Sequence, residues 1–316
     1  MTPSQVVTRR DGRVLVATLQ NPPHGLMTGA MVGELDALVG EVERDTGIGA
    51  VVLHGAHPDR FLAHYDVAEL VAAARATGVR TTPRQAGAAL RAVRAIDRVP
   101  GAGRALERTP AAGLLALERF HELLLRMNRV GAAFIAALDG SALGGGCELS
   151  LACDVRYMAD GDFVIGQPEI LLGIMPGGGG TQRLARLVGS GKALELVLEG
   201  SALSPQEALD IGLVNRIVAQ DRVLDVALET AHRLARRPRI AVEGCKRAVY
   251  EGGSAGLAHG MHVERAVFMA TMTGPAALRG MEAYLDGLQK TGELPGYDPV
   301  AREHLLAGTY ADLTEE

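Results

Sequence analysis

Apolar residues recur at two different spacings in the first part of the chain. Residues 13–19 carry β-branched side chains at alternate positions, which predicts a strand. Residues 31–42 repeat apolar residues every three or four positions with acids between them, which predicts an amphipathic helix. Residues 50–53 resemble a short buried strand, and residues 67–74 a second helix. The order strand, helix, strand, helix indicates a layered α/β fold.

The same patterns continue in the second part, where helices dominate. A helix is expected at 117–127, a buried strand at 133–138, and short strands at 155–157, 163–165 and 213–218. Further helices are expected at 181–188, 193–198, 205–211, 223–234, 240–249, 263–272 and 275–288. The last two are apolar enough to need a partner surface, either the protein's own core or another subunit.

One segment, residues 71–116, differs in composition from its surroundings. It holds eight arginines but only two acids, Asp97 and Glu107, together with prolines and glycines. It is either an insertion that binds an anionic ligand or a solvated helical excursion. We favour the second interpretation, because runs of charge usually form solvated faces.

Composition narrows the class of protein. The chain has 316 residues, a net charge of −5 and a hydrophobic content of 47%, which suit a large folded core and give no reason to expect nucleic acid. Three cysteines without a Cys-x-x-Cys spacing indicate a reduced, intracellular protein. The absence of a signal-like or membrane-spanning run predicts a cytoplasmic protein with no membrane partner. The histidines lack metal-ligand spacing, so we expect no metal.

Two glutamates stand in glycine- and proline-bordered surroundings. In 143–149 (LGGGCEL), a glycine triplet lies between a predicted strand and a helix. Amides at the start of a helix, such as that of Gly145, have no acceptor within the helix and lie at the positive end of its dipole. Glu148 follows in an otherwise apolar run, which favours a raised pKa suited to acid/base chemistry. Glu169 follows Pro168 and precedes another apolar run. The alternatives are glycines that serve only close packing, and glutamates that cap a helix or lie at a surface turn.

The stretch 137–189 (ALDGSALGGGCELSLACDVRYMADGDFVIGQPEILLGIMPGGGGTQRLARLVG) resembles the signature region of the crotonase, or enoyl-CoA hydratase/isomerase, superfamily. The likeness continues through 206–218 and, more weakly, over most of 13–288. It implies an α/β fold in which strand–strand–helix units repeat as a spiral, followed by a helical C-terminal region that builds trimers, often paired into hexamers. We therefore expect a spiral core at 1–218, with an insertion around 71–116, and a helical oligomerisation region at 219–316.

The resemblance also implies roles for individual residues. Two backbone amides, carried over to Ala63 and Gly145, are expected to hold the oxygen of an acyl-CoA thioester. Glu148 is expected to help activate water, and Glu169 to handle the proton at the α-carbon. The Gly177 amide is expected to help position the water. No separate cofactor is implied, since coenzyme A is part of the substrate.

The chain departs from the family pattern beside Ala63. The usual Gly-Ala there is His64-Tyr65, followed by Asp66, and we expect these three residues to contact substrate. The arginine-rich segment makes this region about thirty residues longer than the family resemblance leads us to expect, and its arginines are candidates to meet CoA phosphates.

These features predict a lyase that adds water across the 2,3-double bond of an enoyl-CoA thioester, as in fatty acid metabolism. The alternatives are another reaction of the same superfamily, namely isomerisation, dehydration of a substituted acyl-CoA or C–C hydrolysis, and a non-catalytic binder of CoA thioesters. Retention of both glutamates argues against simple isomerisation and against the binder.

Overall fold

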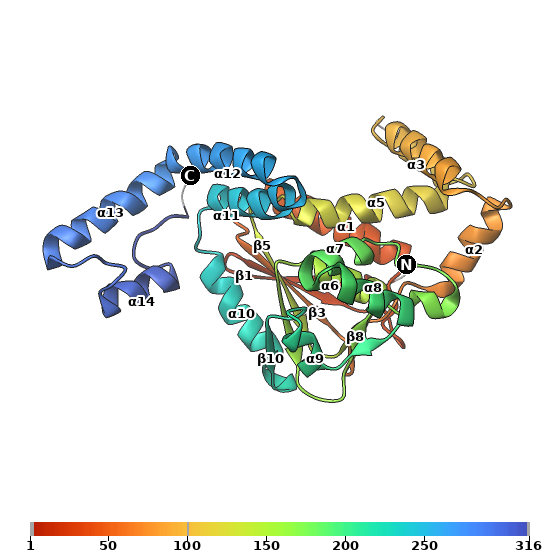
Figure 1. The fold of residues 1–316 in the computed structure, drawn as a ribbon, viewed down its shortest axis with the longest axis horizontal. Coiled ribbons are helices and arrows are strands. Elements are labelled where there is room, and N and C mark those ends of the chain that lie inside the picture. The colour runs from red at the N-terminus through yellow and green to blue at the C-terminus, as the bar shows by residue number, and fades with distance from the viewer. Residues whose placement is uncertain (1–2, 100, 315–316) are drawn as a thin grey trace.

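The computed structural model describes residues 3–99 and 101–314, and two β-sheets form its centre (Figure 1). The large sheet has the order β1-β2-β3-β5-β7-β10 and comprises Val6–Asp11, Val14–Leu19, Ala50–Gly55, Ala133–Leu138, Val155–Ala159 and Arg216–Val218. The small sheet has the order β4-β6-β8-β9 and comprises Arg60–Leu62, Ser141–Leu143, Ile165–Gly166 and Ala202–Leu203. Neighbouring strands are parallel except for the antiparallel pairs β1–β2 and β8–β9.

The chain runs repeatedly from the large sheet to the small sheet and then into a helix. Strands β3 and β4 lead to α2 (Val67–Thr77), and β5 and β6 lead to α6 (Gly145–Ala152). Strands β7 and β8 lead through a short 3₁₀ turn, Glu169–Leu172, to α7 (Gly180–Val188). This arrangement confirms the predicted spiral of strand–strand–helix units. It also brings the ends of β4, β6 and β8 together at one sheet, so the segments that follow them become neighbours.

The strands β2, β3 and β5 of the large sheet are buried on both faces. Alternate residues of each strand point to opposite sides and so belong to two different cores. In β2, Leu15 belongs to the core that includes α1 (Gly29–Arg44) and α5 (Ala112–Met127). Val14 and Val16 belong to the second core, which is closed by α10 (Val223–Leu234). The expected helical region 219–316 therefore begins with a helix that packs on the sheet.

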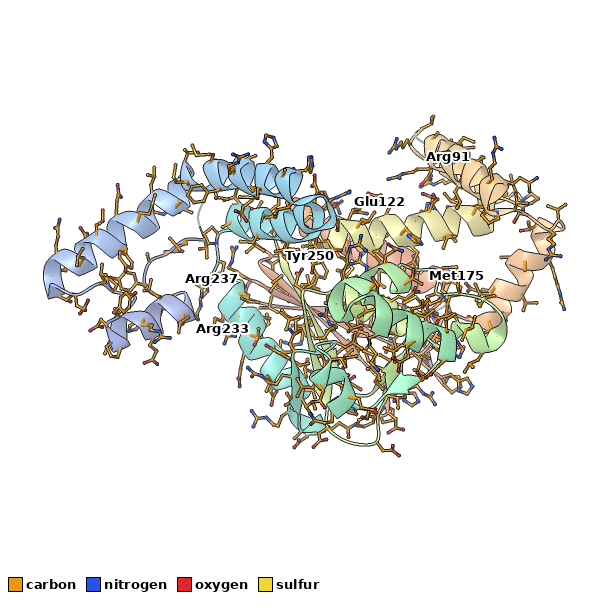
Figure 2. All side chains as sticks on the ribbon, viewed as in Figure 1. Arg91, Glu122, Met175, Arg233, Arg237 and Tyr250 are labelled. Carbon is orange, nitrogen blue, oxygen red and sulfur yellow. The ribbon has the colours of Figure 1, made fainter. Side chains whose placement is uncertain are left out.

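The arginine-rich segment is helical. It contains most of α2, then α3 (Pro83–Asp97), α4 (Ala102–Leu106) and the start of α5. Helix α3, which carries Arg91, packs on α5 at the edge of the molecule (Figure 2). Ion pairs join these helices: Arg94 lies 3.2 Å from Glu122, and Arg119 lies 2.9 Å from Asp97.

The C-terminal helices extend beyond the sheets (Figure 1). Between α7 and α10 lie α8 (Ser190–Glu199), α9 (Pro205–Asp210) and the 3₁₀ turn Gln220–Arg222. After α10 come α11 (Arg239–Lys246), a π turn (Arg247–Glu251), a 3₁₀ turn (Gly252–Ser254), α12 (Leu257–Met272), α13 (Pro275–Thr291) and α14 (Pro299–Ala307). Helices α13 and α14 form an arm that points away from the body. None of the helices in the described ranges is long and apolar enough to cross a membrane.

Some elements were not predicted, for two physical reasons. Strands β4 and β9 have three and two residues, too few to show a period. Strand β1 lies at the sheet edge with mostly exposed polar side chains, so it lacks apolar alternation. Helix α14 also escaped prediction, and α3 was expected only as part of a solvated helical excursion without bounds, since few residues of either helix are buried.

Candidate active site

The start of helix α6 presents an unpaired amide. Gly144 follows strand β6 as the N-cap of α6 and has a φ of 52°, a left-handed value that glycine adopts without strain. The Gly146 amide donates to the Ala63 carbonyl at 3.1 Å, and a Cβ at position 146 would lie 2.1 Å from the Leu62 carbonyl oxygen. Within residues 3–99 and 101–314 the Gly145 amide has no acceptor, and it lies at the positive end of the helix dipole.

The second predicted oxyanion amide, that of Ala63, is not available. It donates a 2.7 Å hydrogen bond to the Gly25 carbonyl, so this part of the prediction needs correction. Two residues further on, Tyr65 pairs with Met27 as an isolated parallel bridge. In that bridge the Met27 amide donates to the His64 carbonyl and the Asp66 amide to the Met27 carbonyl, which leaves the Tyr65 amide on the opposite side.

The Tyr65 amide instead lies beside Gly145. A Cβ built on Gly145 would be 3.3 Å from the Tyr65 nitrogen, and the described part of the chain offers that amide no acceptor. Two unpaired N–H groups therefore lie close together at the start of α6. Such a pair is suited to hold an oxygen that becomes negative in a transition state.

Glu148 lies in the first turn of α6 and is 4% exposed. Its Oε1 accepts hydrogen bonds from the amides of Gly178 at 2.6 Å and Gly180 at 2.9 Å. Burial raises the pKa of Glu148 to about 7 and the charge of Glu169 acts in the same direction, although both amides oppose the shift. A carboxyl group with this pKa exchanges protons readily at neutral pH.

Glu169 begins the 3₁₀ turn after β8 and is partly buried. Burial raises its pKa, and the nearby His64 opposes that rise. With the Gln167 amide oriented to satisfy its hydrogen bonds, its nitrogen lies 2.9 and 3.1 Å from the two Glu169 carboxylate oxygens. A Cβ on Gly144 would lie 3.1 Å from Glu169 Oε1, so glycine at this position lets the carboxylate approach the start of α6.

One cavity of about 690 Å³ joins these groups. Its polar wall includes Glu148, Glu169, Gly145 and Tyr65. The rest of its wall is mostly apolar and comes from α2, from α5 and from the loop after Glu169, namely Val67, Leu70, Ala73, Ala112, Gly113, Ala116, Leu117, Phe120, Leu171, Leu172, Ile174 and Met175. Met175 lies on the side of the body that faces α2 (Figure 2). The cavity therefore combines two carboxyl groups of raised pKa with two free amides inside an apolar enclosure.

Most of the residues predicted to contact substrate line this cavity, but Asp66 caps a helix instead. His64, Tyr65 and Gly177 line the cavity. The Asp66 side chain instead accepts a 2.8 Å hydrogen bond from the Ala68 amide and caps α2. Neither Asp66 nor Ala63 is among the described residues that line the cavity.

Sequence reasoning missed three residues that support the site. Glu69 accepts the Tyr65 hydroxyl, and Phe120 lines the wall next to Glu148. His121 Nε2 lies 2.5 Å from the carbonyl oxygen of Gly177, whose peptide group also carries the Gly178 amide that binds Glu148. The apolar spacing of 117–127 was the available signal for Phe120 and His121, but it predicted only a helix.

Known proteins resemble this chain over most of its length. A model of the enoyl-CoA hydratase/isomerase family matches residues 103–291. A short-chain-enoyl-CoA hydratase of Clostridium acetobutylicum is 33% identical over 250 residues, 79% of this chain and 82% of the relative. A probable enoyl-CoA hydratase of Rhizobium meliloti is 32% identical over 286 residues, 90% and 96% of the two chains. The crystal structure of an enoyl-CoA hydratase from Bacillus anthracis matches with a TM-score of 0.71 at 28% identity, over 90% of this chain and 96% of that one.

Proposed function

The chain belongs to the enoyl-CoA hydratase/isomerase family, and from this premise we propose that it adds water across the 2,3-double bond of an enoyl-CoA thioester. The observation that carries the proposal is the meeting of Glu148 and Glu169 with the free amides of Tyr65 and Gly145 in one cavity. Family membership alone would also fit isomerisation. Two carboxyl groups with raised pKa values favour hydration, because one must accept a proton while the other donates one.

The proposed reaction proceeds through an enolate. The amides of Tyr65 and Gly145 hold the thioester oxygen as it gains negative charge. Glu148, as the carboxylate, accepts a proton from water while the water oxygen bonds to C3. Glu169, as the acid, gives its proton to C2, so that one water molecule is added in total.

The remaining parts of the site have supporting roles in this proposal. The Gly177 amide, which has no acceptor within the described ranges, helps to position the water. The apolar walls from α2 and α5 receive the acyl group and exclude bulk water. The proposed chemistry needs no metal and no cofactor apart from the coenzyme A of the substrate.

Hydration is tested by incubating the protein with a chain-length series of 2-enoyl-CoA thioesters and identifying products by mass. We expect a product heavier by one water molecule with an intact carbon skeleton. Glu148→Gln and Glu169→Gln should each lower kcat by about a hundredfold or more, as expected for groups that transfer protons in the transition state. Undiminished turnover in both variants would refute the mechanism, and an isomerised or cleaved product would point to one of the alternative reactions.

We also propose that the chain assembles into trimers or hexamers through its C-terminal helices. Helix α12 exposes Leu257, Met261 and Phe268 on one face, and α13 exposes Met281 and Leu285. Their exposed fractions lie between 45% and 80%, and apolar faces of this kind mark interfaces. A cytoplasmic location stays a prediction from the sequence.

A further inference from the structure

Tyr65 contributes to the cavity in two ways. Its backbone amide faces the start of α6 beside Gly145, and its side chain forms part of the cavity wall. Whatever holds the Tyr65 side chain therefore also restrains the amide.

The phenol is held by a carboxylate at the start of another helix. The Tyr65 hydroxyl donates to Glu69 Oε2 at 2.8 Å, and the same oxygen accepts the Gly29 amide at 2.9 Å. Gly29 is the first residue of α1, a helix of 16 residues, so the carboxylate lies at the positive end of its dipole. Hydrogen bonds to a carboxylate are about twice as strong as neutral ones.

A side chain on Gly29 would press closely against this contact. A Cβ there would lie 3.3 Å from the Tyr65 hydroxyl oxygen and 3.4 Å from Glu69 Oε2. Burial, together with the bond to Glu69, raises the pKa of Tyr65 well above its usual range, so the phenol keeps the proton that it donates. The contact thus joins three segments: the extended residues 61–66, the first turn of α2 and the start of α1.

We propose that the Tyr65 hydroxyl and Glu69 are positioning residues that hold the Tyr65 amide in place as an oxyanion donor. This inference rests on the proposed function. Neither side chain transfers a proton in the reaction. Loss of the contact lets residues 63–66 shift, and displacement of a catalytic group by about 1 Å can cost a hundredfold in rate.

The test uses Tyr65→Phe and Glu69→Gln in the full chain. The first removes only a hydroxyl group and the second only a charge, so both leave the packing volume nearly unchanged. We expect kcat for enoyl-CoA hydration to fall about tenfold to a hundredfold in Tyr65→Phe and by a smaller factor in Glu69→Gln, whose side-chain oxygen can still accept a hydrogen bond from the Tyr65 hydroxyl, while KM changes by less than about threefold in both. The double variant should lose no more than the worse single variant, because both act through one contact.

A second readout reports the amide directly and does not need turnover. Butyryl-CoA labelled with ¹³C at its carbonyl cannot be hydrated, and hydrogen bonds from the two amides lower its carbonyl stretching frequency. The infrared spectrum of the bound thioester should show a higher frequency in both variants than in the unaltered protein. A residue that only stabilised the fold would not move this frequency.

Matched controls separate positioning from general stability. Tyr157→Phe removes a buried hydroxyl contact with Thr230 at 3.1 Å, between residues that do not line the cavity, and Glu207→Gln weakens the cap of α9. Both should leave kcat and the carbonyl frequency unchanged.

Unchanged kcat and unchanged carbonyl frequency in Tyr65→Phe and Glu69→Gln would overturn the positioning role while leaving hydration intact. If the unaltered protein binds butyryl-CoA but hydrates no enoyl-CoA, the proposed function fails, and the carbonyl frequency still decides the positioning role. If Glu69→Gln does not fold, Tyr65→Phe alone decides it.

Discussion

Replacing Glu148 with Gln should stabilise the folded protein at neutral and alkaline pH. Glu148 is 4% exposed, and burial raises its pKa from an ordinary 4.5 to about 7. Gln has nearly the same shape, and its carbonyl oxygen can still accept the amides of Gly178 and Gly180. The substitution therefore removes the cost of burying a charge while keeping the packing, at the expense of the proposed chemistry.

Proton linkage gives the sign and size of the expected difference in unfolding free energy. Below pH 4.5 Glu148 is protonated in the folded and unfolded chains alike, so its titration contributes nothing. Between pH 4.5 and about 7 the folded chain binds more protons, so stability falls as the pH rises, and the loss is complete above about pH 7. At about 1.36 kcal/mol per pKa unit this interval corresponds to roughly 3 kcal/mol of unfolding free energy.

The measurement is urea unfolding of both proteins from about pH 4.5 to 8.5 at one protein concentration. The stability advantage of Glu148→Gln should grow from near zero to roughly 3 kcal/mol over this range. Glu207 is the control, because its bonds to Ser204 lower its pKa. Glu207→Gln should destabilise the protein at neutral pH, and the penalty should shrink as the pH falls. A difference for Glu148→Gln that does not vary with pH would refute the role of burial.

Three further predictions follow from the site and the surface. The rate of hydration should depend on pH as a bell-shaped curve. It should rise as Glu148 ionises near pH 7 and fall as Glu169, whose pKa is also raised, loses its proton. A flat profile from about pH 5 to 9 would contradict these roles. Gly178→Ala places a Cβ 2.4 Å from Glu148 Oε2 and should lower kcat about a hundredfold, whereas Gly191→Ala, with open space at its Cβ, should not. Phe268→Asp, at a side chain 58% exposed on α12, should reduce the assembly mass in light scattering, and a monomeric unaltered protein would exclude the proposed interface.

The site was predictable where its chemistry depends on neighbours in sequence. The glycine triplet before Glu148 and the proline before Glu169 are local signals, and both glutamates do reach one cavity. The oxyanion amides show the limit of such signals. Ala63 and Tyr65 lie in the same short extended segment, and nothing in its residues tells which amide is free. The Gly25 carbonyl accepts the Ala63 amide, and the bridge to Met27 leaves the Tyr65 amide on the opposite side. These contacts with residues distant in sequence decide which amide is free.

The order of the long periodic helices and strands, the identity of the two glutamates and, through the signature stretch, the spiral fold could be predicted from the amino-acid sequence. The surroundings of these residues depend on contacts between distant segments of the folded chain. The Gly178 and Gly180 amides bind Glu148 across thirty or more residues of chain, and Glu69 joins Tyr65 to the start of α1. The period and propensity of a segment reflect contacts within a few residues, whereas these hydrogen bonds exist only after α6 has packed beside residues 178–180 and α2 has come to lie beside the start of α1.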